Sequence, residues 1–274
     1  MIMRGIILAA GENIRLKSIT NSPKSLLKIG NCCFLDRITI LCKKYAFHQI
    51  VMVVGHKAEE IERHIKENPE IFGDIHVKTI YNRDYASKNN IFSFWLAHRE
   101  MDKPFVLFNS DVLFHEAILE LLLKTNVRSA LMVDDRKTLG QEDMKVIMDK
   151  RLIRGISKDI NPSLASEEYI GLAKFFDRGT VNNVLSKCKL LLDLGRTDVF
   201  YEEAFRLLSI EEPSIYGVST NGLPWIEVDT PEDYQKAKRA SIPSNNINKK
   251  AIRGALLIHQ CTRYRIKVIY DSEN

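Results

Sequence analysis

The sequence predicts an α/β protein with a mostly parallel central sheet, and three observations lead to this prediction. Short apolar runs alternate with segments of helical spacing along the first half of the chain. These runs lack polar alternation, which is typical of parallel strands that are buried on both faces. Gly11, Gly55, Asn82 and Asp111 each follow the end of such a run. Ligands bind at the carboxyl ends of parallel strands, so we expect these four positions to share one edge of the sheet.

The elements of the first half follow from hydrophobic spacing. Leu35, Ile38 and Leu41 lie on one face of a helix, and Ile61 and Ile65 are four residues apart in the next. The predicted strands are 4–10, 49–54, 76–81 and 105–108, and the predicted helices are 34–45, 58–66 and 90–99.

The second half predicts shorter strands, as expected for a smaller mixed or antiparallel extension that covers the site. Thr230 is a good N-cap, and Pro231 suits the first position of the last helix. The predicted strands are 130–134, 144–148, 153–157 and 170–176, and the predicted helices are 180–192, 200–208 and 230–239.

The composition is that of an ordinary globular protein. The chain has 274 residues, of which 45% are hydrophobic and 27% charged. It has no apolar run long enough to span a membrane, and its N-terminus is typical of a strand rather than a signal peptide. Five scattered cysteines without a C-x-x-C pair give neither zinc spacing nor a disulfide framework, so we expect reduced thiols in the cytoplasm.

The net charge of +5 is concentrated in the last 34 residues, which contribute +4 of it. A basic tail on a nearly neutral body argues against a nucleic-acid partner. We therefore predict one domain over residues 1–240, with a nucleotide-binding half at 1–128 and an acceptor-binding half at 129–240. Residues 241–274 form a basic tail, interpreted as an appendage or a disordered extension.

The stretch that follows the first strand favours anion binding. Leu8, Ala9, Ala10 and Gly11 end a strand in small residues, so backbone N–H groups can approach a ligand closely. Arg15 and Lys24 follow within fourteen residues. Backbone donors with two cations suit a polyphosphate, although the stretch is neither G-x-G-x-x-G nor G-x-x-x-x-G-K-[ST]. The alternative is a plain β-turn-α connection with two solvated basic side chains.

Two aspartates supply hard oxygen ligands. Asp111 lies just past a predicted strand, and Asp229 lies just before a predicted helix. Mg²⁺ binds one or two carboxylates together with substrate phosphates, so the pair predicts a magnesium site. The alternatives are a turn residue for Asp111 and a helix cap for Asp229.

The motifs then support a family resemblance. "ILAAGENIRL…SPKSLLKIG" resembles the L-A-A-G-x-G-x-R-[LM]…P-K-x-L signature of nucleotidyltransferases, and "FNSDVLF", "FYEEAF" and "LPWIEVDTPEDYQKA" continue the resemblance in order over roughly residues 3–240. It is strongest to the phosphocholine, phosphonate and inositol-phosphate cytidylyltransferases. The resemblance implies a Rossmann-like three-layer α/β/α nucleotidyltransferase fold.

The resemblance also implies roles for individual residues. Arg15 and Lys24 would contact the phosphates, and Asp111 and Asp229 would bind Mg²⁺, so these four are the expected catalytic residues. Asn13 replaces a family glycine, and asparagine tolerates positive φ well enough to keep the turn. The expected nucleotide-binding residues are Leu8, Ala9, Ala10, Gly11, Glu12, Asn13, Gly55, Asn89 and Ser93.

The acceptor pocket is expected in the covering half. Acids and aromatics there could enclose an ammonium group, and two lysines could reach a phosphate. The alternatives are packing aromatics and solvated lysines. The candidates are Lys145, Lys158, Glu168, Tyr169, Tyr201, Glu202 and Trp225. His48, His56, His64 and His115 have no mutual metal spacing and are interpreted as surface or packing residues.

These features predict a CTP-dependent nucleotidyltransferase that acts on a small anionic acceptor with Mg²⁺ as cofactor. A sugar-1-phosphate nucleotidyltransferase that uses UTP, GTP or dTTP is the alternative. A non-catalytic nucleotide-sensing domain is the alternative of another class. The resemblance also implies a homodimer.

Overall fold

The protein contains one large sheet of nine strands. The computed structural model describes residues 2–165 and 167–240, so the predicted tail and Cys261 lie outside the described residues. The strand order is β5-β4-β1-β6-β11-β8-β12-β10-β9. The strands are β1 (Arg4–Ala9), β4 (Gln49–Val54), β5 (His76–Tyr81), β6 (Phe105–Asn109), β8 (Ser129–Asp134), β9 (Lys145–Asp149), β10 (Leu152–Ser157), β11 (Glu167–Phe175) and β12 (Tyr216–Ser219).

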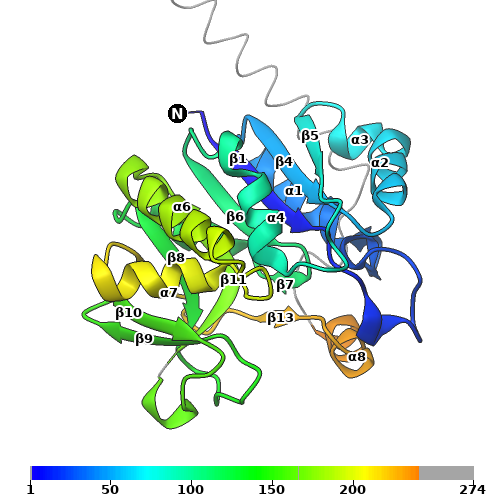
Figure 1. Ribbon diagram of the computed structural model, residues 1–274. Coiled ribbons are helices and arrows are strands. Elements are labelled where there is room, and N and C mark those ends of the chain that lie inside the picture. The colour runs from blue at the N-terminus through cyan, green and yellow to red at the C-terminus, as the bar shows by residue number, and fades with distance from the viewer. Residues whose placement is uncertain (1, 166, 241–274) are drawn as a thin grey trace, which may run out of the picture.

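Helices cover both faces of this sheet, which confirms the predicted α/β/α class (Figure 1). The helices that pack into one apolar core are α1 (Phe34–Lys44), α2 (Ala58–Glu67), α3 (Pro69–Phe72) and α5 (Glu116–Lys124). The helices that pack into the other core are α4 (Asn90–Leu96), α6 (Arg178–Asp193) and α7 (Glu202–Glu211). Strands without polar alternation require this double cover, because both of their faces are apolar.

The second half continues the same sheet rather than forming a separate one. Strands β5, β4, β1 and β6 are parallel, and β11 pairs antiparallel with both β6 and β8. The register of β11 shifts between Tyr169 and Ala173. Gly171 lies in this irregular stretch with φ of +79°, and a Cβ there would come within 3 Å of the Asn109 side chain. The irregularity therefore brings β11 close to the carboxyl end of β6.

A short antiparallel pair joins distant parts of the chain. β7 (Val112–Phe114) pairs with β13 (Trp225–Glu227), and the Val228 N–H donates to the Asp111 carbonyl at 3.1 Å. A hairpin of β2 (Lys28–Ile29) and β3 (Cys32–Cys33) lies next to α1. The pair β7–β13 fixes where the segment before α8 (Pro231–Arg239) meets the main sheet.

Most predicted elements coincide with observed ones, and the differences have local causes. The predicted helix 90–99 is too long, because α4 ends at Leu96 and a separate 3₁₀ turn, His98–Glu100, follows. Thr230 caps α8 and Asp233 completes its capping box, as the Thr-Pro start predicted. The remaining 3₁₀ turns are Ile14–Leu16, Lys24–Leu26 and Pro162–Leu164. Among the described residues, no helix combines the length and hydrophobicity needed to span a membrane.

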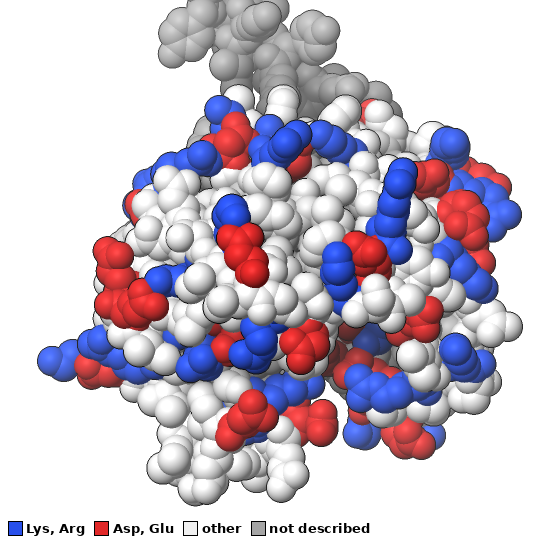
Figure 2. Space-filling view, in the orientation of Figure 1, with Lys and Arg blue, Asp and Glu red and all other residues white. Residues whose placement is uncertain are grey.

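Charged side chains of both signs are interspersed over the face shown in Figure 2. Basic residues on this face alternate with acidic ones rather than gathering into a continuous stripe. Elsewhere among the described residues, Lys78 pairs with Glu100 at 2.6 Å, which is an example of a surface ion pair. This face therefore lacks the basic stripe typical of a nucleic-acid surface.

Candidate active site

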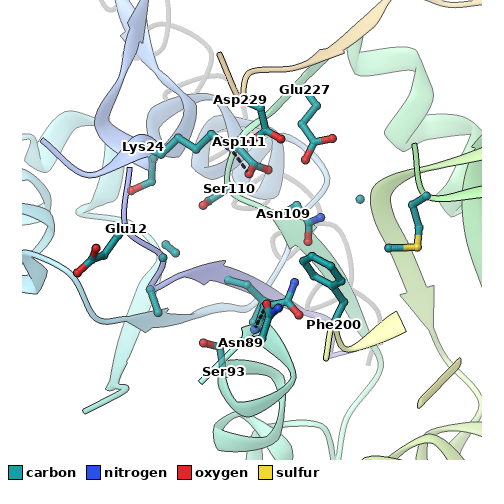
Figure 3. Close-up of a pocket in the computed structure, with 18 of the residues that line it drawn as sticks. Glu12, Lys24, Asn89, Ser93, Asn109, Ser110, Asp111, Phe200, Glu227 and Asp229 are labelled. Atoms are coloured by element: carbon teal, nitrogen blue, oxygen red, sulfur yellow. Dashed lines mark hydrogen bonds and ion pairs between the residues drawn. The ribbon is translucent and has the colours of Figure 1, made fainter. Parts of the chain in front are cut away.

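A pocket of about 320 Å³ opens at the carboxyl ends of β1 and β6 (Figure 3). Residues 8–13 after β1 form one wall, and residues 109–111 after β6 form the floor. The start of α4 forms the side opposite the acidic residues Asp111, Glu227 and Asp229. The pocket thus lies where parallel strands end, which is where α/β sheets bind ligands.

Three carboxylates meet at the top of this pocket. One oxygen from each of Asp111, Glu227 and Asp229 lies within 4.8 Å of the others. The β7–β13 pairing creates the cluster, because it places Glu227 opposite Val112. The Asp111 Oδ1 atom is buried and has no hydrogen-bond partner among the described residues. An oxygen-only donor set with an unused buried acceptor fits Mg²⁺, which these three residues would hold.

Glu227 is missing from the expected metal ligands. It lies two residues before Asp229 at the end of a strand, so the two side chains point to the same face. This i, i+2 spacing in "IEVD" is the signal that could have identified it. The Glu227 carboxyl faces the pocket and is closely surrounded by protein. This partial burial is the largest cause that raises its pKa to about 8, and the negative charges of Asp111 and Asp229 raise it further.

Two cations neutralise the cluster. Lys24 Nζ lies 2.8 Å from Asp111 Oδ2 and also contacts Asp229 Oδ1. Arg15 contacts Asp229 Oδ2 at 2.7 Å and leaves 60% of its side chain exposed. Burial alone would lower the pKa of Lys24, but the two aspartates raise it above its usual range. Burial would raise the pKa of Asp229, and Lys24 and Arg15 instead hold it below its usual range. All four expected catalytic residues therefore lie together.

The loop after β1 presents backbone to the pocket. Leu8, Ala9, Ala10, Gly11, Glu12 and Asn13 all line it. A Cβ on Gly11 would meet no atom of the described chain within 4 Å, so this position borders open space. Asn13 has φ of −87°, which corrects the expectation that the turn needs a left-handed residue there. Its side-chain amide instead donates to the Ser22 carbonyl at 2.7 Å and ties the two ends of the loop together.

The start of α4 forms the far end of the nucleotide side. Asn89 caps this helix by accepting from the Asn90 N–H at 2.7 Å, and its amide donates to the Asp198 carbonyl at 3.0 Å. Ser93 lines the pocket one turn later and accepts from Asn82 at 3.0 Å. The expected positions 89 and 93 therefore both face the pocket.

Gly55 lies behind the loop rather than in the pocket wall. A Cβ there would come within 2.7 Å of both the Ala10 carbonyl and Tyr85 Cβ. The neighbouring His56 N–H donates to the Ala10 carbonyl at 3.0 Å. Gly55 therefore does not line the pocket, in contrast to its expected contact with the nucleotide. Its lack of a side chain instead allows the close packing that supports the loop.

Three of the expected acceptor residues line the pocket. They are Lys158, Tyr169 and Glu202, and Phe200 joins them. Lys158 Nζ lies 5.1 Å from the centre of the Phe200 ring. Glu202 is 5% exposed, and burial raises its pKa to about 7. Its Oε2 atom is buried and has no hydrogen-bond partner within residues 2–165 and 167–240.

Two more of the expected acceptor residues have protein partners instead. Lys145 is fully buried and donates to the carbonyls of Gly140, Gln141 and Asp143 at 2.8–3.1 Å. The ammonium therefore holds a loop and does not line the pocket, although Lys145 borders a neighbouring cavity together with Lys158 and Glu202. Glu168 is buried and pairs with Lys137 at 2.7 Å, and burial, opposed by Lys137, raises its pKa to about 7.

Two aromatics also lie outside the pocket wall. Trp225 donates from Nε1 to Asp134 Oδ2 at 2.7 Å, which corrects its expected place in an acceptor enclosure. Tyr201 is fully buried and stacks on Phe94 with centroids 5.5 Å apart. Its hydroxyl donates to Asn109 Oδ1 at 3.0 Å, so it supports a pocket residue from behind.

Several lining residues carried no signal in the sequence, because their motifs are ordinary loop or strand ends. Asn109 and Ser110 directly precede Asp111 and could have been inferred from it. The lining residues that were not predicted are Ser25, Tyr85, Lys88, Asn90, Asn109, Ser110, Glu142, Met144, Ile170, Gly171, Phe200 and Glu227.

Comparisons with known proteins agree with this geometry. Residues 4–135 match the family model described as nucleotidyl transferase. The choline-phosphate cytidylyltransferase of Streptococcus pneumoniae is 26% identical over 85% of this chain and 96% of its own length. The bifunctional IPC transferase and DIPP synthase of Aquifex aeolicus is 30% identical over 93% of this chain, which spans about half of that relative (54%).

A solved structure shows the same fold. UDP-glucose pyrophosphorylase complexed with UDP-glucose superposes with a TM-score of 0.70 at 15% identity. The match covers 87% of this chain and 98% of that one. At this identity the likeness concerns the fold alone, and it confirms the predicted Rossmann-like architecture.

Proposed function

We propose that this chain is a Mg²⁺-dependent cytidylyltransferase, which is supported by its match to the nucleotidyl transferase family model and by its similarity to a choline-phosphate cytidylyltransferase. It moves CMP from CTP to a small phosphomonoester or phosphonate and releases pyrophosphate. The observation that carries the proposal is the cluster of Asp111, Glu227 and Asp229, with Lys24 and Arg15 against it, at the mouth of the pocket. The cytidylyltransferase among the relatives supports the choice of CTP.

The reaction needs alignment and charge neutralisation more than proton transfer. An acceptor phosphate or phosphonate oxygen is already anionic near neutral pH, so no general base is required. This oxygen forms a bond to the α-phosphorus of CTP, and the bond from that phosphorus to the bridging oxygen of pyrophosphate breaks in line. The electron pair leaves with pyrophosphate. The enzyme must therefore hold two mutually repelling anions in line.

The residues of the pocket divide this work. Lys24 and Arg15 supply positive charge to the phosphates, and the backbone of residues 8–13 orients the nucleotide. Mg²⁺ held by Asp111, Glu227 and Asp229 would supply further neutralisation at the reacting phosphates. Lys158 attracts the acceptor anion, and the unpartnered carboxyl of Glu202 faces the rest of the acceptor.

A pyrophosphate-release assay tests the proposal. CTP, UTP, GTP and dTTP are each combined with phosphocholine, 2-aminoethylphosphonate, inositol phosphate and sugar phosphates, with Mg²⁺ and with EDTA. We expect Mg²⁺-dependent release with CTP and one of the first three acceptors. Faster release with UTP or GTP would overturn the choice of base, and equal release in EDTA would overturn the role of the metal.

A sugar-1-phosphate nucleotidyltransferase is the second candidate, since UDP-glucose pyrophosphorylase has the same fold. The same assay decides between them through the sugar-phosphate arm. A non-catalytic nucleotide-sensing domain fits less well, because all three carboxylates and both cations are present. The cytoplasm supplies CTP and keeps thiols reduced, which suits cysteines 32, 33, 42 and 188, since none of these forms a disulfide within the described residues.

A further inference from the structure

A second cluster of metal-ligating side chains lies apart from the pocket, where β3 and α1 meet α2. Cys33, Asp36 and His64 each offer one ligand atom, and these atoms lie within 4.8 Å of one another. Cys33 and Asp36 are buried, and His64 keeps 17% of its side chain exposed. The three residues come from two segments, so the cluster has no signature in sequence spacing.

The histidine nitrogen faces both other ligands. His64 Nε2 lies 3.5 Å from Cys33 Sγ and 2.7 Å from Asp36 Oδ1. In a tetrahedral zinc site, bonds of about 2.0–2.3 Å separate neighbouring ligand atoms by about 3.3–3.7 Å. The sulfur–nitrogen distance already fits, and the carboxylate oxygen needs to move by only about 0.6 Å. The Asp36 carboxylate can only accept, so His64 Nε2 donates its proton to Oδ1, and a bound metal would take the place of that proton between the three ligand atoms.

The groups around the cluster hold its ligands in place. The Cys33 N–H donates to Asp36 Oδ2 at 3.1 Å, and the Asp36 N–H donates to Cys33 Sγ at 3.4 Å. Phe72 packs edge-on against the His64 ring, with centroids 5.9 Å apart. The Asn68 amide donates to the His64 carbonyl at 2.7 Å, which holds the last turn of α2 beside the ring. Such outer contacts orient the ligands of metal sites and are part of their design.

Charge and ligand type select the metal. One thiolate, one carboxylate and one neutral imidazole with a divalent cation make a neutral buried unit. The thiolate favours Zn²⁺ over Mg²⁺, whereas the oxygen-only cluster in the pocket favours Mg²⁺. The two clusters therefore differ in the cation that they suit.

We propose that Cys33, Asp36 and His64 form a structural Zn²⁺ site that ties the start of α1 to α2. Binding displaces two protons: the thiol proton of Cys33 is released to the solvent, and the proton on His64 Nε2 is exchanged for one on Nδ1, so the imidazole stays neutral. Water fills the fourth tetrahedral position. Cys33 belongs to the β2–β3 hairpin, so the metal would also hold this hairpin against α1 and α2. A plain helix cap with a hydrogen-bonded histidine is the outcome that the test must exclude.

Cobalt titration of the full-length, chelator-treated protein tests the site. Tetrahedral Co²⁺ bound to a thiolate gives sulfur-to-metal charge-transfer absorption and intense visible bands, and we expect both to saturate at one equivalent. Asp111→Asn should keep these bands, because the pocket cluster offers no sulfur. Cys33→Ser and His64→Gln should remove or shift them. Cys42→Ser is the matched control, because Cys42 is a buried cysteine of the same helix outside the cluster.

Thermal unfolding gives a second readout. Zn²⁺ at a hundredfold excess over its Kd should raise the Tm of the wild type by about 5 °C or more, and that of His64→Gln by much less. His64 is partly exposed, so we expect this variant to fold, and circular dichroism checks that it does. Folded wild type without a thiolate band, or unchanged bands in Cys33→Ser, would overturn the proposal.

Discussion

The sequence predicted the two sides of the pocket from different kinds of feature, and with different success. On the nucleotide side, residues 8–13 and Lys24 all line the pocket, and Lys24 contacts Asp111. On the acceptor side, Lys145 and Trp225 satisfy their polar atoms inside the protein and lie outside the wall. Polar residues that follow a parallel strand end are placed by local chain geometry. Polar residues on antiparallel strands take positions that depend on distant pairing.

The electrostatics of the two sides also differ. The nucleotide side holds fixed charges of both signs in direct contact, as between Arg15 and Asp229. The acceptor side holds Glu202, whose pKa burial raises to about 7. One side is therefore built for a strongly charged ligand at any pH near neutrality, whereas the other changes its charge within that range.

The largest effect is expected from the carboxylates of the nucleotide side. Asp111→Asn and Asp229→Asn should each lower kcat by about 10²–10³-fold, the scale of one preorganised electrostatic contact. The measurement is pyrophosphate release at saturating CTP and acceptor. Asp149→Asn is the control, since Asp149 pairs with Arg154 on the surface at 3.3 Å. Unchanged metal-dependent turnover in both pocket variants would contradict the assignment.

Lys24→Met should lower kcat by about 10²-fold and also change the response to metal. Without the ammonium, Asp111 and Asp229 lose their shared counter-charge, and Mg²⁺ becomes the main source of neutralisation. The rise in Tm from EDTA to Mg²⁺ should therefore be larger in this variant than in the wild type. Lys124→Met, at an exposed position, should show the wild-type response. An equal rise in Lys24→Met would show that the lysine does not share charge with the metal ligands.

Glu202→Gln tests whether the charge of the acceptor side changes with pH near neutrality. The folded protein raises the pKa of Glu202 from 4.5 to about 7, so the native state binds its proton more tightly than the unfolded state. Wild-type stability should therefore fall as the pH rises through this window, by at most about 3 kcal/mol from this group. Relative to the wild type, Glu202→Gln should gain stability between pH 5 and pH 8 in urea unfolding. Glu203→Gln, which removes a pair with Arg206, should show no such trend.

The smallest effect on activity is expected from Lys145. Lys145→Met leaves three partly buried carbonyls without this donor and should lower the free energy of unfolding by about 1–3 kcal/mol. The KM for the acceptor should stay within about twofold, because the ammonium does not reach the pocket. Lys158→Met is the matched variant. It should raise the KM for the acceptor by about tenfold, which is the effect expected from the loss of one charged hydrogen bond. Equal KM values for the two variants would remove the distinction between a pocket lysine and a loop lysine.

Much of the fold was predictable because its signals are local. The strands predicted at 49–54 and 76–81 coincide with β4 and β5, and Thr230 and Pro231 predicted the start of α8. The joining of the two halves into one sheet was not predictable, because it depends on β11 pairing with β6 across more than 60 residues. Hydrophobic periodicity reports which face of a strand is buried but not which strand lies beside it.

The candidate site divides in the same way. Asp111 and Asp229 carried a signal through their places at element ends. Glu227 was missed although it stands two residues before Asp229, because the β7–β13 pairing that brings it to Asp111 is not visible in the sequence. Trp225 was misplaced because a sequence cannot show that Asp134 accepts from its indole.

The β7–β13 pair also has a consequence for how the protein acquires its site during synthesis. Its two strands are more than 100 residues apart, so closing this contact carries the entropy cost of a long loop. A chain made from its N-terminus exposes Asp111 well before Glu227 and Asp229 leave the ribosome. The three carboxylates therefore come together only after both halves have folded, which makes this cluster a late feature of the nascent chain. An incomplete chain would therefore contain the loop of residues 8–13 but not the complete cluster of three carboxylates.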